Sequence, residues 1–313
     1  MKHIFIVNPD AGRHSATHAI REAVAACPEH DCIVIETKCP RDATHIVDEC
    51  CERYEGPLRF YACGGDGTIN EVAEGVYHHT DRASLGCYPC GSGNDFVKYY
   101  GGSHVFLDSF RAQLDADERP IDLMRVNDRI AINITNFGFD TVVAKTMIAV
   151  KKKPIIGGRN AYTTGVIKAL FTAMKNRCTV TADGEVLNPD GVMLFGTVAC
   201  GRYVGGSYCC APYSDNTDGL LDVCVAKPIS RFRFVRLVKY YKNGTHLDAP
   251  ECDGIFTTRR ARQVTLDAAP GFGISLDGEI VEGTHFEIEV LPSAIRLAVP
   301  DIHAVDKTDA HRS

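Results

Sequence analysis

Gly64-Gly65-Asp66-Gly67-Thr68 is the stretch that decides the fold. It follows the apolar segment 58–63, which predicts a buried strand, and it precedes a predicted helix over 69–77. A strand that ends in glycines and opens a helix directs backbone N–H groups at a phosphate. Thr68 stands where an N-cap or a phosphate-binding hydroxyl belongs, and Asp66 adds a carboxylate suited to Mg²⁺ or to proton transfer. Taken alone, the stretch is explained equally well as a tight strand-to-helix turn.

Two further strands end in the same way. Residues 2–7 predict a strand that runs into Asn8-Pro9-Asp10-Ala11-Gly12, before a predicted helix over 15–26. Residues 84–89 predict a strand that ends in Gly91-Ser92-Gly93-Asn94-Asp95. One polar turn of this kind is only a turn, but three at one sheet edge indicate a nucleotide site.

The strands predict how these turns are arranged. A fourth apolar strand, 31–36, ends at Thr37. Four strands alternating with helices predict an α/β domain with a parallel sheet covered on both faces. Ligands bind beyond the carboxyl ends of the strands in such sheets, so the polar turns are expected to meet there.

The three polar stretches resemble the nucleotide motifs of the diacylglycerol kinase catalytic family, which includes soluble bacterial lipid kinases, sphingosine kinases and ceramide kinases. The resemblance continues through Gly205-Gly206, Ala211-Pro212, the stretch 215–222 and the late acidic motif Asp277-Gly278-Glu279. It runs from Ile4 to about Leu297, and it is specific for the family but not for the lipid. The resemblance implies ATP and Mg²⁺ as cofactors and an NAD kinase/diacylglycerol kinase-like fold.

The second half of the chain predicts a β-rich domain. Segments 120–126 and 129–135 predict a hairpin across Asn127-Asp128, and two helices are expected near 141–150 and 159–175. The expected strands after them are 178–181, 192–200, 220–226, 263–268, 272–276, 280–281 and 285–291. The resemblance implies that this domain is a β-sandwich, that a last strand over 294–299 packs back on the first domain, and that the active site lies in a cleft between the domains. We therefore expect a nucleotide-binding domain over 1–122, with 293–313 packing back, and a lipid-substrate domain over 123–292.

Composition favours a cytoplasmic enzyme. The 313 residues are 45% hydrophobic, enough for two cores. The chain shows neither a signal-type segment nor an apolar run long enough for a membrane span. Its 14 cysteines lack the spacing of a zinc ribbon and do not fit the small disulfide-rich proteins, so free and mostly buried thiols are expected.

The nucleotide-binding residues follow from the motifs. ATP phosphates need a cradle of N–H groups and hydroxyls, and Mg²⁺ takes only one or two protein carboxylates. Asp66 and Asp95 are the candidates for Mg²⁺. The expected nucleotide-binding set comprises Asn8, Pro9, Asp10, Ala11, Gly12, Thr37, Gly64, Gly65, Asp66, Gly67, Thr68, Ser92, Gly93, Asn94 and Asp95.

The resemblance assigns the general base to Glu279, with Asp277 beside it. Residues two apart on a strand share a face, so both carboxylates are expected to point the same way. The alternative is a plain hairpin turn, because Asp-Gly is a strong turn pair. Asp66 remains a rival base, because eukaryotic members of the family use the aspartate of the first glycine motif.

A second metal site is expected at Asp215, Asp218 and the carbonyl of Leu220. Carboxylates at this spacing with a nearby carbonyl suit a hard cation. The soluble bacterial kinases hold a structural Mg²⁺ at the matching positions, away from ATP. The alternative is an Asx-rich turn before a strand.

Two basic segments suggest contact with anionic lipid headgroups. Residues 141–182 contain no acid, and 231–242 is basic and amphipathic in a chain of net charge −6. The alternative is two ordinary solvated helices. The basic residues of the first segment are Lys145, Lys151, Lys152, Lys153, Arg159, Lys168, Lys175 and Arg177. No nucleic-acid module is recognised, and exposed edge strands of the β-rich domain suggest a homodimer.

These observations together predict an ATP- and Mg²⁺-dependent lipid kinase, peripherally bound to the membrane. Diacylglycerol, giving phosphatidic acid, is the leading substrate. A sphingoid base or another lipid alcohol, an NAD kinase, and a lipid-binding regulator that has lost catalysis are the alternatives. Arg13-His14 stands where the family has a lysine-rich position, which keeps the last alternative open.

Overall fold

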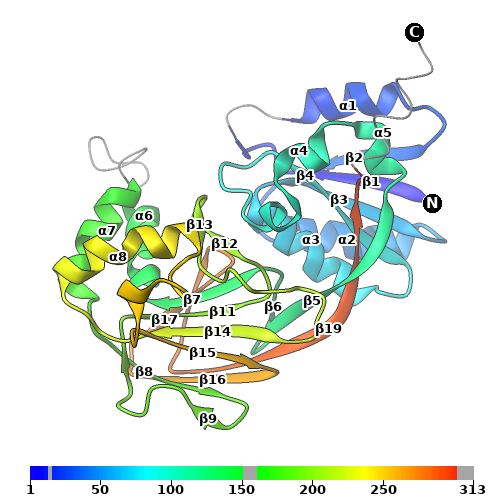
Figure 1. The fold of residues 1–313 in the computed structure, drawn as a ribbon. Coiled ribbons are helices and arrows are strands. Elements are labelled where there is room, and N and C mark those ends of the chain that lie inside the picture. Colours follow the sequence, from blue (N-terminus) through cyan, green and yellow to red (C-terminus); the bar gives the residue numbers. More distant parts are fainter. Residues whose placement is uncertain (13–15, 151–160, 302–313) are drawn as a thin grey trace. The chain divides into compact units, whose positions relative to one another are not determined.

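The computed structural model describes residues 1–12, 16–150 and 161–301. The chain divides into two units, Met1–Leu123 with Pro292–Ser313, and Met124–Leu291 (Figure 1). It passes from one unit to the other within two strands, β5 (Asp117–Val126) and β19 (His285–Val299). Each unit has its own core.

Unit 1 is built on a parallel sheet with the strand order β19-β4-β3-β1-β2. The strands are β1 (Lys2–Val7), β2 (Asp31–Glu36), β3 (Leu58–Gly64), β4 (Ala83–Pro89) and the end of β19. Every residue of β3 is buried, as expected for a strand covered on both faces. The predicted parallel α/β sheet is confirmed.

Helices cover the two faces of this sheet. The helices are α1 (Thr17–Ala25), α2 (Asp42–Arg53), α3 (Asp66–His78), α4 (Ser103–Leu107) and α5 (Phe110–Leu114), with a 3₁₀ turn, η1 (Phe96–Tyr100). Phe5, Tyr61 and Ile20 form a core with Leu114 on the α1 and α5 face. Helices α2 and α3 lie side by side on the opposite face (Figure 1).

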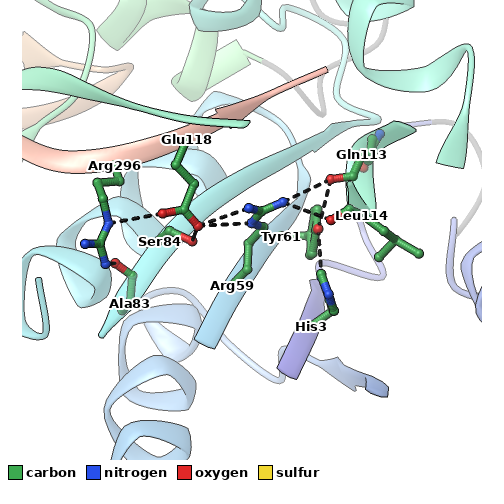
Figure 2. Close-up of polar contacts among 9 residues, drawn as sticks. All are labelled: His3, Arg59, Tyr61, Ala83, Ser84, Gln113, Leu114, Glu118 and Arg296. Atoms are coloured by element: carbon green, nitrogen blue, oxygen red, sulfur yellow. Dashed lines mark hydrogen bonds and ion pairs between the residues drawn. The ribbon is translucent and has the colours of Figure 1, made fainter. Parts of the chain in front are cut away.

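A partly buried ion cluster joins the strands at the edge where β3 and β4 begin (Figure 2). The Glu118 carboxylate accepts from Arg59 Nη2 at 3.0 Å and from the Ser84 hydroxyl at 2.6 Å, and it pairs with Arg296 Nε at 3.1 Å. These residues come from β5, β3, β4 and β19. The cluster therefore fastens the unit 1 ends of β5 and β19 to the central strands.

The same edge continues as a chain of hydrogen bonds (Figure 2). Arg59 Nη1 donates to the carbonyls of Gln113 and Leu114 at 3.3 and 3.1 Å. The Tyr61 hydroxyl donates to Gln113 O at 3.1 Å and lies 3.0 Å from His3 Nδ1. Burial, and then the positive charge of Arg59, lower the pKa of His3 to about 4, so this ring is neutral near pH 7.

Unit 2 is a β-sandwich, as the resemblance implied. One sheet is antiparallel with the order β15-β14-β11-β7-β17-β18, and β10, β8, β16 and the start of β19 form the other, with β9 and the β5–β6 hairpin attached. Val198, Phe137 and Leu266 belong to the core between the sheets. The strands are β6 (Arg129–Ala131), β7 (Ile134–Gly138), β8 (Asn176–Ala182), β9 (Glu185–Val186), β10 (Val192–Met193), β11 (Phe195–Ala199), β14 (Leu221–Ala226), β15 (Phe256–Ala261), β16 (Gln263–Ala268), β17 (Gly273–Leu276) and β18 (Glu279–Glu282), beside a small hairpin of β12 (Tyr203–Val204) and β13 (Tyr208–Cys209).

Three helices cover the outer face of the six-stranded sheet: α6 (Phe139–Val150), α7 (Ala161–Thr172) and α8 (Arg231–Asn243) (Figure 1). Phe139, Phe195 and Phe234 join them to the sheet in a second core. Among the described residues, no helix is long and apolar enough to cross a bilayer. All 14 cysteines lie in described segments and are free thiols, most of them buried, as expected.

Three strand predictions were wrong. The strand expected over 192–200 is split into β10 and β11, which belong to different sheets. The strand expected over 129–135 ends at Ala131, and β7 begins at Ile134 in the other sheet, because the Asp277 carboxylate takes the backbone N–H groups between them. The strands expected over 285–291 and 294–299 are one strand, β19. Ser293 takes φ +48° within it and donates its N–H to Asp122 Oδ1 at 2.7 Å, which accommodates Pro292 without ending the strand.

Candidate functional site

The three glycine-containing loops meet at the carboxyl edge of the unit 1 sheet. Asn8 Nδ2, after β1, donates to Thr68 Oγ1 at 3.3 Å. Gly64 O, at the end of β3, accepts from Cys90 N and Gly91 N at 2.9 and 3.1 Å. Each loop is thus hydrogen-bonded to another, and the predicted gathering of polar residues at this edge is present.

Glycine is required where the loops touch. A methyl group added at Gly91 would lie 2.4 Å from Gly65 Cα, and one added at Gly12 (φ +73°) would lie 2.4 Å from Cys90 O. Real Cβ atoms do not approach so closely, so no side chain fits there. Gly67 differs, because a methyl group there would meet nothing within 4 Å. The loops are close-packed against each other, and Gly67 faces open space.

Helix α3 begins three residues earlier than predicted, at Asp66. Gly65 is its N-cap, so the expectation that Thr68 occupies the N-cap position was wrong; Thr68 lies in the first turn. No side chain caps this helix. The first N–H groups of a helix have no intrahelical acceptor, so an uncapped N-terminus beside glycine loops is suited to an anion.

Two carboxylates converge beside Gly93. A methyl group added at Gly93 would lie 3.0 Å from Asp66 Oδ2 and 3.5 Å from Asp95 Oδ2. Asp66 Oδ1 accepts the N–H of Phe96 at 3.0 Å, and Asp95 Oδ1 pairs with Lys98 Nζ at 2.6 Å. Burial raises the pKa of Asp66, and the negative charge of Asp95 raises it further.

This convergence fits a divalent cation. Two like charges held together in a half-buried site favour a cation between them, and Mg²⁺ completes its shell with waters and phosphate oxygens. Lys98 was not predicted as a site residue. Its position three residues after Asp95, on one face of the η1 turn, was the available signal.

Asn94 connects the third loop to α4. It adopts φ +50° and donates through Nδ2 to Ser103 Oγ at 3.2 Å. Its Oδ1 is buried without a hydrogen-bond partner. A buried polar atom of this kind calls for a ligand or water. Ser92 beside it is exposed.

The remaining predicted residues of unit 1 lie at the sheet edge with backbone roles. Asp10 N donates to Asn8 Oδ1 at 3.0 Å, and Ala11 N donates to Asn8 O at 3.2 Å, which closes the turn around Pro9. Thr37 N donates to Val7 O at 2.9 Å and so extends the pairing of β1 with β2. Arg13, His14 and Ser15 lie outside the described residues.

The late acidic motif lies in unit 2 and forms a two-residue turn between β17 and β18. Asp277 and Gly278 have φ +46° and +95°. The Asp277 carboxylate accepts the backbone N–H groups of 132–134 at 2.7 to 3.2 Å. The expectation that Asp277 and Glu279 share one strand face was therefore wrong, because Asp277 belongs to the turn.

Glu279 is the first residue of β18. Its side chain is 46% exposed, and its Oε2 lies 3.3 Å from Arg129 Nη1. The Glu279 carboxylate thus contacts solvent and one cation, whereas the Asp277 carboxylate accepts three backbone hydrogen bonds. Its role as a base stays a prediction.

The predicted second metal site is a turn held by its own side chains. Asp215 Oδ1 accepts from Thr217 N at 3.0 Å, Asp218 Oδ1 accepts from Leu220 N at 2.9 Å, and Arg260 pairs with Asp218. In segments 1–12, 16–150 and 161–301 no cluster of three or more His, Cys, Asp or Glu side chains is arranged to hold a metal.

Asp222, at the start of β14, was not singled out from the sequence. Its Oδ2 is buried without a hydrogen-bond partner. Burial raises its pKa to about 6, Arg202 opposes the shift, and Asp215 adds to it. The signal for Asp222 was its place at the end of the acidic stretch 215–222.

Comparison with known proteins identifies the family. A family model described as "Diacylglycerol kinase catalytic domain" matches residues 2–126, and one described as "YegS C-terminal NAD kinase beta sandwich-like domain" matches 133–299. A "Probable lipid kinase YegS-like" of Pseudomonas aeruginosa (strain PAO1) is 31% identical over 296 residues, or 92% of each chain. The "Diacylglycerol kinase" of Bacillus subtilis (strain 168) is 29% identical over 277 residues, or 88% of each chain.

Solved structures agree with this assignment at the level of the fold. A structure described as a putative diacylglycerol kinase from Bacillus anthracis str. Sterne has a TM-score of 0.72 and 23% identity, over 95% of this chain and 96% of that one. The two family models follow each other along nearly the whole sequence, in the order of the two units. The chain belongs to the diacylglycerol kinase-like family of lipid kinases that includes the YegS proteins.

Proposed function

We propose that the protein is an ATP- and Mg²⁺-dependent lipid kinase that transfers the γ-phosphoryl group of ATP to a lipid hydroxyl, with diacylglycerol as the leading acceptor. The observation that carries this proposal is the meeting of three loops around the uncapped N-terminus of α3, with Asp66 and Asp95 converging at Gly93. The names of the relatives support a lipid acceptor. Such an enzyme would act at a membrane surface. We propose that it is a cytoplasmic protein that associates peripherally with the membrane.

Unit 1 supplies the phosphate and metal ligands. The free N–H groups of the first turn of α3 bind phosphate oxygens, and open space at Gly67 admits them. Asp66 and Asp95 hold Mg²⁺, which neutralises phosphate charge when bound. Lys98 fixes the Asp95 carboxylate through its ion pair.

Unit 2 supplies the proton acceptor. We assign this role to Glu279: its carboxylate takes the proton of the lipid hydroxyl as the hydroxyl oxygen bonds to the γ-phosphorus and the bond to the ADP oxygen breaks. Asp277 is a positioning residue, because its three backbone hydrogen bonds fix the turn that precedes Glu279. Asp66 remains the rival base.

The test is a transfer assay with γ-labelled ATP and Mg²⁺. Mixed micelles each carry diacylglycerol, monoacylglycerol, sphingosine or ceramide, and NAD serves as a soluble acceptor. Label in one lipid, lost in Asp66→Asn and Glu279→Gln but retained in Glu282→Gln on the same strand, supports the proposal and names the acceptor. Label in NAD alone overturns the lipid acceptor. ATP binding without label in any acceptor supports the regulatory alternative.

The same variants separate the two candidate bases. Removing a base leaves nucleotide and metal binding intact, whereas removing a metal ligand does not. We expect Glu279→Gln to bind MgATP with unchanged affinity and to lose turnover, and Asp66→Asn to lose both. Unchanged turnover in Glu279→Gln would leave Asp66 as the base.

A further inference from the structure

An arginine lies beside the proposed base. Arg129, the first residue of β6, donates through Nη1 to Glu279 Oε2 at 3.3 Å. The two side chains are 38% and 46% exposed, respectively. Ion pairs that are this open to solvent contribute little to stability, so holding the fold together does not explain the pair. The alternative is an ordinary surface contact, and the surroundings of the pair decide between the two readings.

The backbone on both sides of this pair is fixed. Arg129 lies in the β5–β6 hairpin, whose turn is attached to β19. Asn127 in that turn donates its N–H to Glu287 O at 2.8 Å, and its Oδ1 accepts the N–H of Glu287 at 2.8 Å. The turn before Glu279 is held against the segment that follows β6 by three hydrogen bonds. The fold itself therefore brings the two side chains together.

The nucleotide loops carry no basic side chain of their own. The stretches 8–12, 64–68 and 91–95 contain neither Lys nor Arg. Lys98, close to the third loop, is paired with Asp95 at 2.6 Å. In phosphoryl transfer, negative charge spreads over the three equatorial oxygens of the group in transit, and an arginine commonly stabilises that charge. A cation from elsewhere in the chain would complete the site.

The position of Arg129 suits this task. A general base acts from about 2.6 to 3.2 Å from the hydroxyl whose proton it takes. The hydroxyl oxygen in turn lies about 3 to 3.5 Å from the phosphorus that it attacks. A guanidinium in contact with the same carboxylate therefore comes within reach of the oxygens on that phosphorus. The group has five N–H donors in one plane, and the contact with Glu279 uses one of them.

Lys145 gives a contrast on the same strand. It belongs to the basic segment predicted over 141–182, and its Nζ pairs with Glu282 at 2.6 Å, at the other end of β18. Arg177 of that segment lies on β8. Lys151, Lys152, Lys153 and Arg159 lie outside the described residues. Arg129 is thus the cation that the structure sets beside the proposed base.

We propose that Arg129 is a catalytic residue, which binds the γ-phosphoryl group while it passes from ATP to the lipid hydroxyl. The inference rests on the proposed function, because it assigns a role in that transfer. The hydroxyl oxygen bonds to the γ-phosphorus, the bond to the ADP oxygen breaks, and Glu279 takes the hydroxyl proton. Arg129 stays protonated throughout and stabilises the equatorial oxygens, which carry the most charge in the transition state.

The first test compares transfer rates with the acceptor that the wild type phosphorylates. Arg129→Gln is expected to lower kcat about 100-fold or more. The KM for ATP should change less than about threefold, because the contact forms only in the transition state. Arg129→Lys keeps the charge but not the planar fork, so it should have an intermediate rate.

Arg125→Gln is the matched control for this test. Arg125 lies in the same hairpin and pairs with Glu289, and these two side chains are 43% and 39% exposed. It should transfer at the wild-type rate, because Glu289 has no part in the proposed transfer. A rate in Arg129→Gln within about twofold of wild type, or an equal loss in Arg125→Gln, would overturn the proposal.

A second measurement separates contact with the phosphoryl group from a role through Glu279 alone. MgADP with aluminium fluoride mimics the planar group in transit, and calorimetry measures its affinity with acceptor micelles present. In a Glu279→Gln background, we expect Arg129→Gln to weaken this affinity about tenfold or more while MgATP affinity stays unchanged. No weakening in that background would mean that Arg129 only positions Glu279, and it would refute the proposed contact.

The outcomes keep this inference apart from the proposed function. Transfer to a lipid that persists in Arg129→Gln would refute the inference and leave the kinase standing. No transfer by the wild type to any acceptor would refute both. Melting curves verify that each variant is folded. If Arg129→Gln does not fold, Arg129→Lys replaces it, with an expected loss of kcat of about tenfold.

Discussion

The two edges of the unit 1 sheet each hold a carboxylate, and their pKa values shift in opposite directions. Burial raises the pKa of Glu118, but the Ser84 hydroxyl and the Arg59 guanidinium outweigh it, so the pKa lies below its ordinary value. Burial also raises the pKa of Asp66, and there the bonds to backbone N–H groups do not compensate for it. At the Glu118 edge the cations and the hydroxyl outweigh burial, whereas at the Asp66 edge the one cation that acts on Asp66, Lys98, is paired with Asp95 and does not offset burial.

This difference separates stability from function. A carboxyl group whose pKa is lower in the folded protein than in the unfolded chain stabilises the fold at pH values above its unfolded-state pKa. That contribution is lost as the pH falls through the pKa of the folded state. A carboxyl group whose pKa is raised in the folded protein has the opposite effect on the pH dependence of stability. Its stabilising contribution is present at low pH and is lost as the pH rises through the pKa of the folded state. At neutral pH, therefore, Glu118 stabilises the fold and ionised Asp66 destabilises it until a cation binds.

The largest expected effect is that of Asp66→Asn. Phosphoryl transfer should fall about 1000-fold, because a metal ligand is lost. The free energy of unfolding at pH 7 should not fall, because asparagine can still accept the Phe96 N–H without a buried charge. Transfer rates and urea unfolding measure the two, and Asp81→Asn on the surface is the control. A loss of stability as large as the loss of activity would contradict the comparison.

The reverse pattern is expected for Glu118→Ala. Removing this carboxylate leaves the buried Arg59 without its ion-pair partner, which costs about 3 kcal/mol of unfolding free energy. MgATP affinity of the folded protein should stay unchanged, because the cluster is at the other edge of the sheet. Urea unfolding and calorimetric titration test this, with the exposed Glu52→Ala as control. Weaker MgATP binding in folded Glu118→Ala would show that the edges are coupled.

Most of unit 1 could be predicted from the sequence, because its signals are local. The strands β1 and β2 have the predicted bounds, since each is an apolar run that ends at a polar residue. The break between β6 and β7 could not be predicted, because Asp277, which causes it, lies more than 140 residues further along the chain. Strand β15 was missed, because this edge strand has apolar residues only at its two ends, Phe256 and Ala261, and carries the exposed pair Arg259 and Arg260 between them.

The sequence predicted which residues form the candidate site better than it predicted the contacts that they make. The glycines and acids of the three loops do meet, because parallel strands deliver their carboxyl ends to one edge. Two features of the site depend on contacts between distant segments. Asp66 accepts the N–H of Phe96, and Asp277 accepts three backbone N–H groups. Such contacts are set by the packed fold and leave no local pattern in the sequence.

A smaller effect is expected when one methyl group is added at Gly67, in the first turn of α3. Gly67→Ala should weaken MgATP binding about tenfold, because the methyl group occupies space left for phosphates. The unfolding free energy should change little, since nothing lies within 4 Å of the new atom. Gly91→Ala is the contrast: its methyl group would strike Gly65 Cα, so stability should fall as well. Unchanged affinity in Gly67→Ala would place the phosphates elsewhere.

The smallest expected effect is a pH dependence at the Glu118 edge. Between pH 6 and about pH 3, wild-type protein should lose more unfolding free energy than Glu118→Gln, by about 1 kcal/mol or less after solvent screening. The sign follows from the lowered pKa of Glu118, whose contribution disappears on protonation. The contribution of His3 is common to both proteins and cancels in the difference. If the unfolding free energies of the two proteins fell equally with pH, the partners of Glu118 would not be keeping it ionised.

The most direct test of the central claim is calorimetric titration of ATP with and without Mg²⁺, in wild type and in Asp66→Asn. We expect Mg²⁺ to strengthen ATP binding to the wild type and to have little effect on binding to the variant. At mildly acidic pH, Mg²⁺ binding should release a proton from the wild type only, because the pKa of Asp66 is raised. The same Mg²⁺ dependence and proton release in Asp66→Asn would contradict the claim that this sheet edge holds the metal and its nucleotide.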